Sequence, residues 1–129
     1  MLDFTQPVGL VLAAVLHFVA DDAHAFDVVA QLVKPLPAGS YLVMSHAAAE
    51  TYQPDSDQGK AAGSVYKQQA ATAGAVRTRA DIERFFAGFE LVDPGIVWVT
   101  EWRPDGEVPP EFADHPERCG IWAAVGRKV

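Results

Sequence analysis

The sequence predicts a mixed α/β domain in which two parallel strands are followed by an antiparallel hairpin, with helices flanking the sheet. Two apolar runs, at residues 8–14 and 41–45, lie on either side of one amphipathic segment. A third run, at 120–126, alternates along its length near the end of the chain. A strand, a helix and a strand within about 40 residues form a βαβ unit, whose crossover is expected to be right-handed.

The first strand is expected at residues 8–14, directly after Pro7. Its run is apolar throughout, which is typical of a parallel strand buried on both faces. The polar exception, His17, falls where this strand should end. Because ligands bind outside the carboxyl ends of the strands in open parallel sheets, we expect a site at this point.

A helix is expected at residues 23–34, with Asp21 or Asp22 as its N-terminal cap. Pro35 and Pro37 end it, and the second strand follows and ends at His46. The apolar residues that recur at helical spacing are Phe26, Val29, Ala30 and Val33.

The sequence of residues 47–63 predicts a polar loop or the frayed start of a helix, and residues 64–73 predict a helix that Gly74 ends. A Thr-Arg-Ala-Asp run at 78–81 fits the capping-box pattern, so a short helix is expected from there to Gly88.

The last third predicts a β structure interrupted by a long connection. Extended segments are expected at 89–92 and 96–102, broken at Pro94 and Gly95. Residues 103–118 are rich in Pro, Asp and Glu and predict a surface loop, after which the strand at 120–126 closes the sheet as a hairpin partner.

The composition bounds the kinds of partner. A chain of 129 residues, half of them apolar, fits a single domain. Its formal charge of −7 argues against a nucleic-acid backbone as the main partner. The first apolar run is too short to span a bilayer, and no basic residues precede it to make a secretion signal. With Cys119 as the single cysteine, we expect a soluble, cytoplasmic protein.

The chain resembles the C-terminal half of class I S-adenosylmethionine-dependent methyltransferases. Within them it is most similar to the bacterial S-adenosyl methyltransferase family that was long described as a domain of unknown function. The order of the elements and a Val-Leu-His-Phe-Val run at 15–19 carry this resemblance. The matching residues are 2–4, 7–9, 13–19, 39–43, 45–47, Arg77, Arg79, 85–86, 88–92, 94–95, 102–104 and 125–128.

The resemblance implies that the chain is half of a doubly wound, Rossmann-like sheet. In such methyltransferases the first half of the fold holds the cofactor, through a Gly-rich turn after strand one and an acidic residue after strand two. The chain has no G-x-G-x-x-G-like turn, and its first strand resembles the fourth strand of the family. We therefore expect residues 1–129 to be the C-terminal half of the fold, with the cofactor-binding N-terminal half absent.

His17 and His46 end two strands of one right-handed unit, so they should be neighbours on one rim of the sheet. With the resemblance, Ala13, Ala14, His17 and Phe18 are expected on the cofactor side. His46 and Arg77 are expected towards the acceptor. Either histidine could act as a general base or could simply fasten the loops, because methyl transfer often needs only alignment of the reacting atoms.

No metal is expected. His115 and Cys119 stand four residues apart, but a structural zinc site needs about four ligands.

The resemblance, together with the missing cofactor-binding half, leaves two possible functions. In the first, the chain is a methyltransferase domain that is not active by itself, with S-adenosylmethionine as cofactor and an unknown small-molecule acceptor. In the second, it is a non-catalytic remnant that self-associates. Without its neighbouring strands, the edge of the strand between Val8 and Ala14 lies bare, which predicts a homodimer through this edge. Residues 1–6 or the acidic loop could instead cover it.

Overall fold

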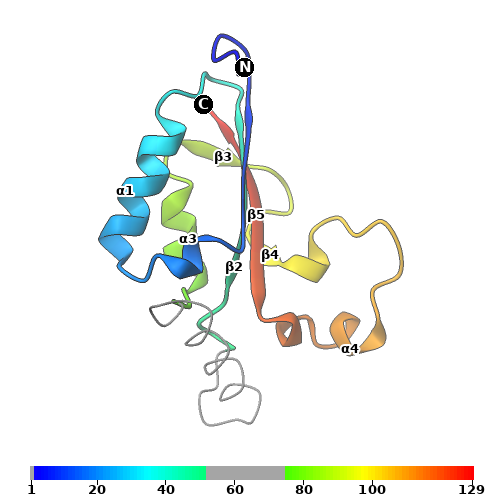
Figure 1. The fold of residues 1–129 in the computed structure, drawn as a ribbon. Helices are drawn as coiled ribbons and strands as arrows, with labels where there is room; N and C mark the ends of the chain where they lie inside the picture. Colours follow the sequence, from blue (N-terminus) through cyan, green and yellow to red (C-terminus); the bar gives the residue numbers. More distant parts are fainter. Residues whose placement is uncertain (1, 52–74) are drawn as a thin grey trace.

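The computed structural model describes residues 2–51 and 75–129 (Figure 1). The helix expected at 64–73 therefore lies outside the described residues. Within the part that the structure describes, no helix combines the length and the apolar character needed to cross a bilayer.

A mixed sheet forms the centre of the fold, as predicted. Its strands lie in the order β1-β2-β5-β3, and β4 also pairs with β5. β1 and β2 are parallel, whereas β5 runs antiparallel to β2, β3 and β4. The strands are β1 (Gly9–Ala13), β2 (Tyr41–Ala47), β3 (Phe89–Leu91), β4 (Val97–Trp98) and β5 (Ile121–Lys128).

The predicted helix between the parallel strands is α1 (Asp22–Val33), and Asp21 caps it. The Asp21 carboxylate accepts a hydrogen bond of 2.8 Å from the backbone N–H of His24. At the other end of the helix, the Lys128 ammonium donates to the carbonyls of Val33 and Leu36, both at 2.7 Å. These bonds satisfy carbonyls that a helix end leaves without partners.

The predicted capping box is also present and begins α3 (Arg79–Phe85). The Thr78 hydroxyl accepts from the N–H of Asp81 at 3.1 Å, and the Asp81 carboxylate accepts from the N–H of Thr78 at 3.3 Å. Both α1 and α3 lie on the same side of the sheet (Figure 1). The core lies between these helices and the sheet. Its buried residues include Leu42 and Met44 of β2, Val29 of α1, and Ile82 and Phe85 of α3.

Two predicted segments differ from the structure. The strand expected at 96–102 is confined to Val97–Trp98, because the chain turns into the 3-10 helix η2 (Val99–Glu101) directly afterwards. The loop expected at 103–118 contains α4 (Pro110–Ala113) and the 3-10 helix η3 (Pro116–Cys119). Each of these turns has a proline at its start, where the fixed φ of proline favours a helical first turn.

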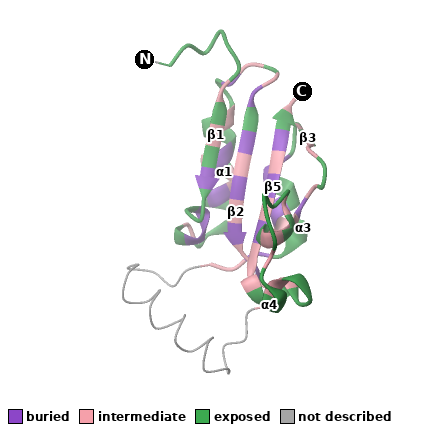
Figure 2. Cartoon of the chain, turned by 90° about the vertical axis from the view of Figure 1, so that its right-hand side faces the viewer, coloured by how far each residue is buried: buried purple, intermediate pink, exposed green. Residues whose placement is uncertain are grey.

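Burial along β1 also differs from the expectation of a strand covered on both faces. Leu12 is buried against the helices, whereas the side chain of Val11 is 62 % exposed. Gly9 and Ala13 are exposed as well. β1 lies at the edge of the sheet with exposed residues along it (Figure 2), because α1 and α3 cover only the opposite face.

Gly126 in β5 tests the close packing of the sheet against the loop that follows α3. A Cβ at this position would lie 2.6 Å from Cδ1 of Phe86 and 2.9 Å from Cβ of Phe89. We expect Gly126→Ala to lower the free energy of unfolding by about 1–3 kcal/mol, as overpacking does. Gly106→Ala, where nothing lies within 4 Å, is the control in urea denaturation. Equal stability of the two variants would contradict the tight contact.

Candidate functional site

The carboxyl ends of β1 and β2 meet at one rim because the two strands are parallel and Ala13 pairs with Ser45. β1 stops at Ala14, whose φ is 53°, in the left-handed region. Its N–H donates to both the carbonyl and the hydroxyl of Ser45, each at 3.1 Å. A residue other than glycine in this conformation is strained by about 1–3 kcal/mol, so these bonds hold a sharp change of direction.

The chain then forms the 3-10 helix η1 (Leu16–Phe18), which lies against the end of β2. Leu16 and His17 are buried, whereas Phe18 is 45 % exposed. The rings of His17 and Phe18 have centroids 4.1 Å apart. The rim therefore presents an aromatic surface beside the small residues Ala13 and Ala14.

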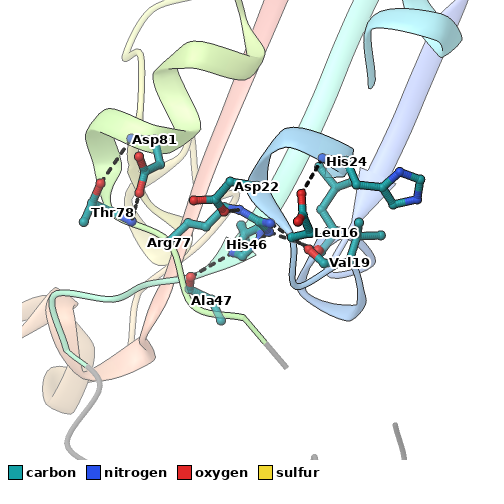
Figure 3. A network of polar contacts seen from close by, with 10 residues as sticks. Leu16, Val19, Asp22, His24, His46, Ala47, Arg77, Thr78 and Asp81 are labelled. Atoms are coloured by element: carbon teal, nitrogen blue, oxygen red, sulfur yellow. Dashed lines mark hydrogen bonds and ion pairs between the residues drawn. The ribbon is translucent and has the colours of Figure 1, made fainter. Parts of the chain in front are cut away.

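Arg77 joins this rim to β2 and α1 (Figure 3). Its side chain is only 1 % exposed, and its guanidinium donates to four groups. The acceptors are the Asp22 carboxylate at 3.0 Å, the Leu16 carbonyl at 3.0 Å, the Val19 carbonyl at 2.6 Å and Nε2 of His46 at 2.8 Å. A buried charge of this kind is stabilising only when its donors are paired, and here they are.

The backbone places Arg77 at this position by extending the sheet. Arg77 bridges in parallel with Ala48, just beyond β2. Its N–H donates to the carbonyl of Ala47 at 3.1 Å, and its carbonyl accepts from Ala49 at 2.8 Å. One residue further, Thr78 begins α3, so the same turn fixes the arginine and starts the helix.

The partners of His46 determine its tautomer. Its Nδ1 lies 2.8 Å from the carbonyl of Ala47, which can only accept, and its Nε2 lies 2.8 Å from the guanidinium, which can only donate. The imidazole is therefore neutral, with its proton on Nδ1. Burial lowers the pKa of His46, and the charge of Arg77 lowers it further.

His17 and His46 are neighbours, as predicted from the two strand ends. Their ring centroids are 6.3 Å apart and the rings are nearly perpendicular. Burial also lowers the pKa of His17. Because both imidazoles are neutral, there is no electrostatic repulsion between them or between either ring and the Arg77 guanidinium.

Glu50 anchors the other end of the same rim. Its carboxylate accepts from the N–H of Arg79 at 2.8 Å and from the indole of Trp122 at 3.1 Å. A hollow of about 830 Å³ lies beside it, with Glu111 and Phe112 in its wall. No local sequence pattern predicts this hollow, because its lining residues come from separate segments of the chain.

Comparisons with known proteins agree with the arrangement of the sheet. The sequence profile of the S-adenosyl methyltransferase family matches residues 1–129. The chain belongs to this family. No functionally curated protein sequence matches it.

Two solved structures of relatives are about twice as long as this chain. A DUF574 family protein from Streptomyces avermitilis is 40% identical, with a TM-score of 0.77 over 100% of this chain and 47% of that one. A Thermobifida fusca protein assigned as a methyltransferase is 32% identical, with a TM-score of 0.77 over 99% of this chain and 46% of that one.

A more distant structure agrees in fold alone. An O-methyltransferase family 2 protein from Planctomyces limnophilus is 19% identical, with a TM-score of 0.54 over 98% of this chain and 33% of that one. The two more similar relatives have a Rossmann-like fold, and this chain spans about half of their length.

All six residues predicted for the site lie at this rim, but with different exposure. Phe18 and the two alanines are exposed, whereas both histidines and the arginine are buried. The lone pair of His46 Nε2 is engaged by Arg77, so the observed geometry uses His46 to fasten loops. Its role as a general base and that of Arg77 towards an acceptor stay predictions.

Local sequence patterns do not predict the ion pair of Arg77 with Asp22, because they indicate Asp21 or Asp22 only as a helix cap. The two residues are 55 positions apart and no local pattern connects them.

Loss of the Arg77 guanidinium should be costly. We expect Arg77→Met to lower the free energy of unfolding by about 2–4 kcal/mol, because two carbonyls and His46 lose their donor. Arg118→Met, which removes an exposed arginine of η3, should change it by no more than about 0.5 kcal/mol. Urea denaturation of the two variants checks this, and similar costs would contradict the buried network.

The neutral state of His46 predicts a loss of stability in acid. A folded-state pKa below the ordinary 6.5 means that the unfolded chain binds more protons, so stability is present above pH 6.5 and is lost as pH falls towards the folded-state pKa. His46→Gln should show a smaller decrease in free energy of unfolding between pH 7.5 and about pH 5. His115→Gln, an exposed histidine, is the control. An unchanged slope in His46→Gln would contradict this.

Proposed function

We propose that this chain forms the C-terminal half of an S-adenosylmethionine-dependent methyltransferase that acts on a small-molecule acceptor, and that it needs the N-terminal half for activity. The observation that carries the proposal is the match of the whole chain to the family, although it spans only 47% and 46% of two related structures. The parallel pair of β1 and β2 supports it, because ligands of doubly wound sheets bind at this end of such strands.

The rim fits one side of the cofactor. Ala13 and Ala14 are small enough for close approach, and Phe18 offers an exposed aromatic face beside them. The Asp22 carboxylate, which could bind ribose hydroxyls, is engaged by Arg77. The described residues thus form one wall, and the methionine and ribose groups need donors and acceptors from elsewhere.

When bound, S-adenosylmethionine supplies an electrophilic methyl group. The contribution of this chain is to hold the rim in place, with His17 beside the cofactor and His46 on the acceptor side. The hollow next to Glu50 lies beyond the same end of β2 and offers space for an acceptor. Since the lone pair of His46 is engaged, alignment of the reacting atoms is the mode of catalysis that this geometry supports best. We expect the reaction to take place in the cytoplasm.

Isothermal titration with S-adenosylhomocysteine tests this proposal. We expect no micromolar binding by the chain alone, but micromolar binding by a chimera that joins the N-terminal half of the S. avermitilis relative to this chain. Phe18→Ala in the chimera should weaken binding several-fold, because the exposed ring is lost without loss of core. A folded chimera that does not bind would overturn the proposal, and binding by the chain alone would remove the need for a second half.

A further inference from the structure

The outer edge of β1 has unpaired backbone groups at alternate residues. Val8 accepts from the N–H of Tyr41 at 2.9 Å, and Ala14 donates to Ser45 at 3.1 Å, so the even-numbered residues face β2. In a parallel ladder the residues between them face the other way. The N–H and C=O groups of Gly9, Val11 and Ala13 therefore point outward, and no described strand pairs with them.

Between Gly9 and Ala13 this edge has neither of the residue types that most often prevent pairing between edges. Its sequence, Gly-Leu-Val-Leu-Ala, contains no charge and no proline. Edge strands of stable monomers usually have charged residues, proline or a bulge there. An unprotected edge favours addition of another strand.

The spacing of the outward groups is self-complementary. If two copies pair antiparallel about a two-fold axis at Val11, Val11 lies opposite its own copy and Gly9 lies opposite Ala13 of the second chain. Every outward N–H then meets an outward carbonyl. Gly9 has no side chain and that of Ala13 is a single methyl group, so neither obstructs this pairing.

Exposed apolar residues at both ends of the strand would extend the contact. Leu2 and Phe4 precede β1, and Val15 and Phe18 follow it, and all four are exposed. An antiparallel pair brings the segment before one strand to the segment after the other. Five paired residues form a small contact compared with the ~1,200 Å² that a stable interface buries. The association would therefore also use apolar area from these side chains.

We propose that two copies of this chain associate through β1 in this antiparallel register, which joins their sheets into one. This association uses the outward groups of β1 and does not require methyl transfer. It would hold for a catalytically inactive chain as well.

Sedimentation or light scattering at tens of micromolar tests the association. We expect a dimer for the unmodified chain and a monomer for Val11→Lys, because the two-fold axis would bring two ammonium groups together. Val99→Lys, a matched change at another exposed valine, should remain dimeric. A monomeric unmodified chain, or a Val11→Lys variant that remains dimeric, would overturn the proposal.

Disulfide trapping in a Cys119→Ser background tests the register. Val11→Cys should cross-link efficiently, because hydrogen-bonded partners have Cα atoms about 5.5 Å apart, within the disulfide range. Gly9→Cys should not, because its two copies would lie roughly 13 Å apart.

A mixture of Gly9→Cys and Ala13→Cys chains should cross-link, since these positions are opposite each other. Equal cross-linking of all variants, or of none, would overturn this register and with it the proposal.

Discussion

The buried guanidinium of Arg77 holds together segments that are far apart in the sequence. It donates to the carbonyls at the start of η1 and just after its end, to the carboxylate at the start of α1 and to the imidazole near the end of β2. Desolvation of such a charge costs several kcal/mol unless its donors are paired. Asp22 stays 58% exposed, so only one member of the ion pair loses its water. The desolvation cost is therefore lower than for an ion pair with both members buried, and a small domain can compensate for it.

The network also determines which protonation states the rim can have. A protonated His46 would place a second cation 2.8 Å from the guanidinium and would lose its acceptor lone pair. His46 must therefore stay neutral for the rim to keep its shape. Together with the turn at Ala14, this fixes the direction of η1 before any ligand binds. Pre-organisation of this kind lowers the cost of aligning reactants.

Most of the fold could be predicted because its signals are local. The apolar runs, the Asp21 cap and the Thr78 capping box lie within a few residues of the elements that they define. The proximity of His17 and His46 could also be predicted, because it follows from the ends of two parallel strands. The contact between Arg77 and Asp22 could not be predicted, because it forms only after three elements have packed. The exposure of Val11 depends likewise on what covers a sheet face, which a run of apolar letters does not specify.

The edge of β1 takes part in both of the proposed assemblies. If the proposed N-terminal half is present, a doubly wound sheet of order 3-2-1-4-5 gives β1 a second neighbouring strand on its outer side. That neighbour would use the same outward groups of Gly9, Val11 and Ala13 that a second copy would use. Completion of the methyltransferase sheet and self-association are therefore mutually exclusive at this edge. The concentration and affinity of each partner decide which of the two forms. A covalently joined N-terminal half has a high effective concentration and would displace a second copy, whereas a chain without that half keeps its edge open to self-pairing.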